Sequence, residues 1–312
     1  MHITDIDIFL GDLEFSYQDL EREIGADLAK KITEKSGFVS RFVTSPDNDI
    51  FNIGREAINS GHLHQKLAEA DLVIVVSEYV ASLIPPPSSF LLQNFVSDKT
   101  LIVDLNRGCS GFCEAVVLAN SLYNQGLIER TVIITAENYS KIIKRSNRTL
   151  APIFSDAIAF TCIDNFDDNV LQSNFGFDHR RNFDLMYDRS IAELHMNGAG
   201  IISFVNSKVI PKIKNLIQET ESKKAIDYFF AHQGSELVIN SINEQLSDHQ
   251  IKAEFLSSMT GNTNSSSIPL CIKSTLGGQN TKDVYRCLLS GFGVGLSFCN
   301  VLTDIRYSND NC

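Results

Sequence analysis

Cys109 is the residue whose surroundings point most directly to chemistry. It follows the apolar run LIVDLN at 101–106, has glycines nearby at Gly108 and Gly111, and is followed at once by an apolar helical pattern. A thiol at a helix N-terminus meets the positive end of the helix dipole and unpaired backbone N–H groups, which favour thiolate and can stabilise a thioester oxyanion. A buried structural cysteine in a tight turn fits the same pattern. Cys109 alone is therefore a candidate nucleophile.

Two polar residues further along the chain could assist such a nucleophile. His232 directly follows the apolar run AIDYFFA at 225–231, and Asn262 stands in the turn sequence GNT. Taken separately, a histidine at the end of a strand is more typical of a hydrogen-bonded core residue, and GNT of an ordinary turn. A catalytic role for either depends on the pattern that all three residues form together.

The elements that must position these residues alternate between strand-like and helical patterns, which predicts an α/β fold with a parallel or mixed central sheet. The second half has the same pattern as the first: a strand is followed by a polar residue at the start of a helix. A polar stretch at 162–184 separates them, so we predict two halves, 1–165 and 166–312. The expected strands are 71–79, 100–106, 131–138 and 225–233, and the expected helices are 114–127 and 235–246.

The composition limits the partners and the compartment. The chain has 312 residues and a formal net charge of −11, which argues against a broad nucleic-acid-binding surface. The N-terminus carries acidic residues in place of a signal sequence, and no apolar run is long enough to cross a membrane. We therefore predict a cytoplasmic protein that contacts neither membrane nor nucleic acid.

The seven cysteines are odd in number and scattered, which is typical of a reducing compartment. They form no CxxC pair, and no group of His and Cys has zinc-ligand spacing. The sequence therefore predicts no metal site.

Four motifs in order along the chain resemble those of ketoacyl-ACP synthase III, a family of condensing enzymes in the thiolase superfamily. DLNRGCSGFCEAVVLAN at 104–120 resembles its cysteine segment, and AHQGSELVI at 231–239 its histidine motif. TGNTNSSSIPL at 260–270 resembles its asparagine motif, and GFGVGLS at 291–297 its closing glycine-rich loop. The resemblance implies a five-layered αβαβα thiolase-like fold of two similar halves, normally a homodimer.

The resemblance also implies roles for single residues. Cys109 would accept an acyl group from acyl-CoA or an acyl carrier protein, with the backbone N–H groups of Cys109 and Val294 as oxyanion hole. His232 and Asn262 would bind the thioester carbonyl of a malonyl-type donor during decarboxylative Claisen condensation. Gly293 would lie in the same loop, and Phe292 would pack beside the nucleophile. No cofactor is implied beyond these thioester substrates.

Glu78 and Ile84 are two further candidates from the same resemblance. Hydroxymethylglutaryl-CoA synthases, a sister branch, carry a catalytic glutamate in a segment similar to IVVSEYVASLIPPP at 74–87. Glu78 is thus a candidate general base, although a carboxylate on a surface loop is the favoured interpretation. Ile84 matches a position that helps to shape the acyl pocket of the partner subunit.

The chain departs from the family pattern near the expected substrate entrance. It has no Trp, and Lys31 stands where the family usually places one. Leu237 replaces a basic residue, and Ser235 replaces the Asn of the histidine motif. Because basic residues bind CoA phosphates or acidic carrier helices, these changes indicate a specialised relative with redirected partner choice.

Two alternatives to a condensing enzyme stay open. The same Cys109 and His232 could transfer an acyl group to an oxygen or nitrogen nucleophile without decarboxylation. The chain could also be the partner subunit of a heterodimeric ketosynthase, although the retention of Cys109, His232 and Asn262 argues against this.

Overall fold

A computed structural model describes residues 1–78, 84–166, 171–220, 225–278 and 284–308. The first sheet is built from the N-terminal half, and its interior strands are apolar on both faces, as a sheet covered on both sides requires. In spatial order its strands are β5 (Leu101–Leu105), β4 (Leu72–Val76), β6 (Thr131–Glu137), β7 (Ala157–Asn165) and β1 (His2–Leu10). β4 is parallel to β5 and β6, whereas β7 is antiparallel to β6 and β1.

The second sheet is built from the C-terminal half. β12 pairs in parallel with β11 and antiparallel with β13, and β13 pairs antiparallel with β8. The strands are β11 (Tyr228–Ala231), β12 (Val284–Gly293), β13 (Ser297–Tyr307) and β8 (Gln172–Phe177). The sheets are therefore mixed, and the strands expected near 71–79, 100–106, 131–138 and 225–233 are all present.

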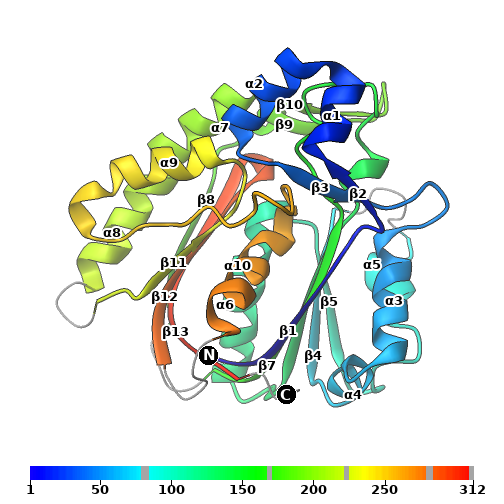
Figure 1. The fold of residues 1–312 in the computed structure, drawn as a ribbon. Coiled ribbons are helices and arrows are strands. Elements are labelled where there is room, and N and C mark those ends of the chain that lie inside the picture. The colour runs from blue at the N-terminus through cyan, green and yellow to red at the C-terminus, as the bar shows by residue number, and fades with distance from the viewer. Residues whose placement is uncertain (79–83, 167–170, 221–224, 279–283, 309–312) are drawn as a thin grey trace.

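Helices and sheets alternate in five layers, as Figure 1 shows. Two helices lie between the sheets, while the others named below cover the two outer faces. The inner pair is α6 (Gly111–Asn124) and α10 (Ser267–Leu276); the outer helices are α3 (Ile50–Ser60), α4 (Leu63–Ala68) and α5 (Pro87–Leu91) on the first sheet, and α7 (Gly198–Phe204), α8 (Ile210–Thr220) and α9 (Glu236–Gln245) on the second. This is the predicted αβαβα arrangement.

The buried apolar side chains form three clusters that fill the spaces between these layers. The middle cluster includes Phe112 and Val116 of α6 and Ile268 and Ile272 of α10. Because α6 and α10 are covered by a sheet on each side, much of their surface is apolar, unlike that of a surface helix. Both inner helices are thereby fixed in position along their length.

The first and second sheets are joined into one sheet of nine strands in the described residues, because β1 and β13 pair in parallel, at His2 with Arg306 and Ile3 with Tyr307. β8 pairs with β13 of the second sheet, and β7 ends at Asn165 in the first. The division into halves at 165 and 166 follows this change of sheet but remains a prediction about domains, since hydrogen bonds join the sheets.

Smaller elements cover the end of the sheets that carries Cys109. Two antiparallel pairs of strands and two helices lie there. They are β2 (Leu13–Ser16) with β3 (Ser40–Val43), β9 (Leu185–Asp188) with β10 (Glu193–Met196), and α1 (Tyr17–Ile24) with α2 (Ala26–Ser36). None of the helices in the described residues is long and apolar enough to cross a membrane.

Candidate active site

Cys109 and Asn262 are placed together by the starts of the two inner helices. Cys109 lies in a short 3-10 turn, Gly108–Ser110, that leads directly into α6. Gly108 has φ of 47°, in the left-handed region that glycine adopts without steric cost. Asn262 follows Gly261, whose φ is 70°, and precedes the turn that leads into α10. Because α6 and α10 both begin at this end of the molecule, the side chains of Cys109 and Asn262 lie close together there.

These residues line a cavity of about 550 Å³ together with His232, Phe292 and Gly293. His232 follows the last residue of β11, and Phe292 and Gly293 end β12. Most of the remaining lining is apolar and includes Ile153, Phe154 and Ile201. The structure thus brings Cys109, His232 and Asn262, which come from three distant segments, to the surface of one apolar cavity.

The environment of Cys109 disfavours the thiolate form of its side chain. Burial raises the pKa of Cys109 well above its usual range, and the carboxylates of Glu78 and Glu137 raise it further. Backbone N–H groups of Val294 and of Cys109 itself act in the opposite direction. The two backbone groups expected to form the oxyanion hole therefore lie close enough to the sulfur to act on its pKa.

Asn264, which the sequence did not mark, contacts the nucleophile directly. Its Oδ1 accepts a hydrogen bond from Cys109 Sγ at 3.8 Å, and its backbone N–H donates to Asn262 Oδ1 at 2.9 Å. Asn264 is buried and has a φ of 51°, which is uncommon for a residue other than glycine. It joins Cys109 and Asn262 in one hydrogen-bonded group.

His232 is held as a neutral imidazole. Its Nδ1 lies 2.8 Å from Ser267 Oγ, and the ring packs edge-on against Phe292, with the centroids 5.5 Å apart. Burial lowers the pKa of His232 to about 4, while a hydrogen bond to the backbone of Asn264 opposes this shift. A ring that is neutral at pH 7 can donate one hydrogen bond without carrying a charge.

Gly293 has no Cβ atom, and the Cys109 side chain occupies the space that a Cβ atom there would fill. A Cβ atom added at Gly293 would lie 2.8 Å from both Cβ and Sγ of Cys109. We expect Gly293→Ala to displace the thiol and to slow acylation of Cys109 by about 10-fold or more, since small displacements of a reacting group are costly. Intact-mass measurement of acyl-enzyme formation over time checks this.

The matched control is Gly278→Ala, because an added Cβ at Gly278 meets nothing within 4 Å. Both variants should fold, as judged by circular dichroism. Normal acylation of the Gly293 variant would show that the thiol does not need this space.

Glu78 lies beside the nucleophile and is not the exposed loop carboxylate that the sequence favoured. Its side chain is half-buried and packs against Gly108, and its Oε2 accepts a very short hydrogen bond from the hydroxyl of Tyr139. Burial raises the pKa of Glu78, and the Tyr139 hydrogen bond opposes the rise. The structure therefore places this carboxylate close enough for its charge to act on Cys109.

A second carboxylate, Glu137, accompanies Glu78 and was not singled out by the sequence. Its Oε2 accepts a hydrogen bond from the backbone N–H of Glu78 at 3.1 Å, and its Oε1 accepts one from Ser265 at 2.8 Å. Burial raises the pKa of Glu137 well above its usual range, and the charge of Glu78 adds to the rise. The sequence carries little sign of this residue, because Glu137 simply ends an apolar strand.

The charge of Glu78 should set the pH at which Cys109 reacts. Since burial and then Glu78 raise the pKa of Cys109, the acylation rate of the native chain should rise from neutral to alkaline pH. Glu78→Gln removes the nearby negative charge, so its pH–rate profile should shift towards lower pH, with faster acylation at pH 7. Acylation rates measured by intact mass between pH 6 and 10 test the shift.

Glu69→Gln serves as control, because Glu69 is an exposed partner of Arg130. A Glu78→Gln variant that is slower at every pH would instead identify Glu78 as the general base for Cys109.

The three residues that differ from the family pattern, Lys31, Ser235 and Leu237, all line the cavity. Lys31 of α2 and Leu237 of α9 line it, and Leu237 is 48% exposed. Ser235, which also lines it, caps α9 by accepting a hydrogen bond from the backbone N–H of Val238 at 3.2 Å. Ile84 is 94% exposed and is not among the residues that line the cavity.

Comparison with known sequences agrees with this geometry. The profile described as 3-oxoacyl-[acyl-carrier-protein (ACP)] synthase III matches residues 103–178, and the profile of its C-terminal region matches residues 216–305. Together the matches cover just over half of the chain. This chain belongs to the ketoacyl-ACP synthase III family. It is therefore an acyltransferase of the condensing type, and the family and enzyme class predicted from the motifs are confirmed.

Individual family members are distant in sequence. Beta-ketoacyl-[acyl-carrier-protein] synthase III 2 of Halalkalibacterium halodurans is 24% identical, over 96% of this chain and 95% of that protein. The match therefore spans almost the whole of both chains.

Solved structures confirm the predicted thiolase-like fold. The 3-oxoacyl-(acyl-carrier protein) synthase of Burkholderia xenovorans superposes with a TM-score of 0.86 at 19% identity, covering 99% of this chain and 96% of that one. The priming beta-ketosynthase of the R1128 polyketide pathway gives 0.84 at 22% identity, covering 97% and 96%. These identities support the fold alone.

Proposed function

We propose that this protein is a self-sufficient condensing enzyme that loads an acyl group on Cys109 and extends it with a malonyl-type thioester. The observation that carries the proposal is that Cys109, His232 and Asn262 face one cavity. Acyl loading followed by decarboxylative condensation uses all three of these residues. Transfer of the acyl group to an oxygen or nitrogen nucleophile does not need Asn262, so its presence favours condensation.

In the first step Cys109 attacks the carbonyl of an acyl thioester. The thiol gives up its proton, the tetrahedral oxyanion accepts hydrogen bonds from the backbone N–H groups of Cys109 and Val294, and CoA or phosphopantetheine leaves as a thiol. The acyl group stays on the sulfur. The apolar walls of the cavity, including Phe154 and Ile201, suit a hydrocarbon portion of the substrate.

In the second step a malonyl-type thioester binds with its thioester carbonyl between His232 and Asn262. Loss of carbon dioxide leaves an enolate, whose negative oxygen is stabilised by N–H donors of the two side chains. Ser267 would donate to Nδ1 of His232 and so leave the other ring nitrogen as the donor. The enolate carbon then attacks the acyl-enzyme carbonyl, forming a carbon–carbon bond and releasing Cys109 as thiolate.

The approach to the cavity suits a thioester carried on phosphopantetheine. Lys31 and Lys35, both on α2, line the cavity, and lysines attract the phosphates of CoA or of a carrier arm. The family usually has a Trp at the position of Lys31 and a basic residue at the position of Leu237, and this chain has neither. The two lysines support binding of acyl-CoA or an acyl carrier protein in their place. No further cofactor is required by the steps proposed.

The enzyme is proposed to act as a cytoplasmic homodimer in fatty-acid or polyketide synthesis, with a specialised pathway favoured by its departures from the family pattern. The exposure of Ile84, 94% in the single chain, fits a side chain that a partner subunit covers. In that arrangement Ile84 would help to shape the partner's acyl pocket. A heterodimer would leave the same side chain covered.

The decisive experiment incubates the purified chain with a panel of acyl-CoA and acyl-carrier thioesters, then adds a malonyl thioester. Acyl-enzyme formation followed by release of carbon dioxide and a 3-oxoacyl product supports the proposal. Acylation with transfer to an alcohol or amine, without carbon dioxide, supports the non-decarboxylating alternative. Failure to accept any acyl group would indicate that a partner subunit is required.

A further inference from the structure

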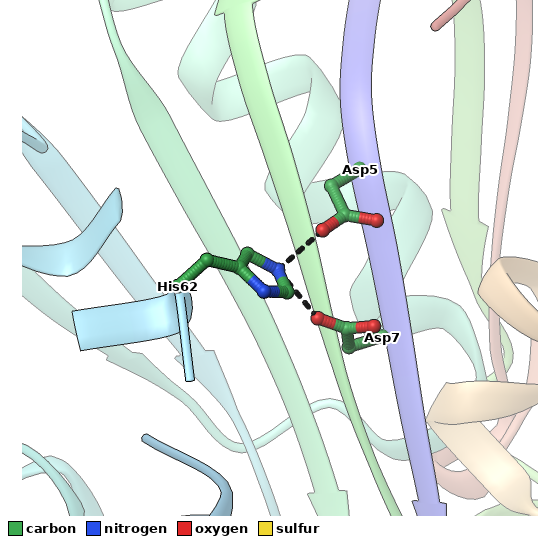
Figure 2. A group of neighbouring side chains, drawn as sticks. All are labelled: Asp5, Asp7 and His62. Atoms are coloured by element: carbon green, nitrogen blue, oxygen red, sulfur yellow. Dashed lines mark ion pairs between the residues drawn. The ribbon is translucent and has the colours of Figure 1, made fainter. Parts of the chain in front are cut away.

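A second group of chemically capable side chains lies away from Cys109, where α4 meets β1. Asp5 and Asp7 are alternate residues of β1 and so point from the same face of the strand. His62 directly precedes α4, and its Nε2 lies 2.5 Å from Asp5 Oδ2 and 2.8 Å from Asp7 Oδ2. Figure 2 shows the imidazole directed between the two carboxylates. All three donor atoms lie within 4.8 Å of one another.

One imidazole nitrogen is shared by two carboxylates in this arrangement. His62 Nε2 and Asp7 Oδ2 are both inaccessible to solvent, and although they form an ion pair, neither atom makes a hydrogen bond of good geometry. An N–H group points in one direction and donates well to one oxygen in line with it, whereas here two carboxylate oxygens converge on one nitrogen. A buried polar atom without a well-aligned hydrogen bond costs free energy, unless a bound ion or water molecule interacts with it.

We propose that Asp5, Asp7 and His62 bind a divalent transition-metal ion such as zinc. Imidazole nitrogen and carboxylate oxygen are ligands that zinc prefers, with bonds of about 2.0–2.2 Å, and calcium and magnesium prefer oxygen alone. In a tetrahedral site with such bonds the donor atoms lie about 3.4 Å apart. The two carboxylate oxygens, now 2.5 and 2.8 Å from His62 Nε2, would each have to move away from the nitrogen by about 0.6–0.9 Å to admit the ion.

The surroundings fit a metal that joins two elements of the fold. The His62 side chain is 35% exposed, which leaves a route for the ion and for a water molecule as a further ligand. The other oxygen of Asp7, Oδ1, lies 3.4 Å from Lys273 Nζ, and such outer contacts commonly orient ligating carboxylates. The ion would fix the start of α4 to β1, and so stabilise the first sheet against its outer helices.

The test measures zinc binding to chelator-treated protein by titration calorimetry, in a Cys109→Ala background so that the reactive thiol cannot bind the metal. We expect one equivalent of zinc and a thermal unfolding midpoint raised by about 3 °C or more at saturation. His62→Gln and Asp7→Asn should each weaken binding by at least about 10-fold. His64→Gln, an exposed histidine on the same helix, should bind zinc like the parent.

Cobalt provides an independent readout, because its visible absorption bands report the ligand geometry. Bands that appear with the parent and His64→Gln chains, and not with His62→Gln, support the site. A folded parent that binds no zinc, or a His62→Gln variant that binds it equally well, overturns the proposal and leaves the three side chains as an ion-pair cluster.

Discussion

A Cys109→Ala variant is expected to gain no mass from any acyl thioester that acylates the native chain, and its condensation rate should fall by at least about 10³-fold. The reason is that the acyl group has no other acceptor in the cavity with the position and chemistry of Cys109. The backbone N–H groups of Val294 and Cys109 that would stabilise the oxyanion lie close enough to the sulfur to act on its pKa. Intact mass and product formation measure the two effects separately.

Cys113→Ala is the matched control for this experiment. Cys113 is also buried and lies four residues after Cys109, in the first turn of α6, so its replacement by Ala removes the same atom from a neighbouring buried position. It should fold and should acylate at a rate close to that of the native chain. A Cys109→Ala variant that still gained the acyl mass would falsify the assignment of the nucleophile.

The location of the site could be predicted from the sequence because its parts carry local signals. Cys109 and Asn262 stand beside glycines that have positive φ at Gly108 and Gly261, and His232 follows an apolar strand. A glycine at a turn and an apolar run before a polar residue can each be recognised from a few neighbouring residues, without knowledge of the rest of the fold. The mixed central sheet was predictable for the same reason, since strands covered on both faces are continuous apolar runs. The five layers were expected only from the resemblance to the family.

The electrostatic surroundings of the site could not be predicted, because they depend on contacts between distant segments. Glu137 and Tyr139 look like the end of an ordinary strand, and only the folded chain brings them to Glu78 and Cys109. The sequence favours an exposed loop carboxylate for Glu78, whereas in the structure the side chain is half-buried. Likewise His62 shows no metal-ligand spacing in sequence, since its neighbours Asp5 and Asp7 belong to the first strand.

His232→Ala and Asn262→Ala should separate the two chemical steps. Each variant is expected to form the acyl-enzyme at a rate within a few-fold of native and to lose about 10²–10³-fold in decarboxylative condensation, the usual cost of removing one donor to a developing oxyanion. Because burial lowers the pKa of His232 to about 4, the ring is neutral above about pH 5. The native condensation rate should therefore show no loss from protonation of His232 between pH 6 and 8.

The measurement follows acyl-enzyme by intact mass and carbon dioxide release from a malonyl thioester, with His64→Ala, an exposed imidazole on α4, as control. The comparison is informative because Asn262 also accepts a hydrogen bond from Asn264, which contacts Cys109. If Asn262 served mainly to support Asn264 and the thiol, its replacement would slow acylation as much as condensation. Equal losses in both steps would thus contradict a role for Asn262 at the malonyl carbonyl, whereas loss of condensation alone assigns it to the second step.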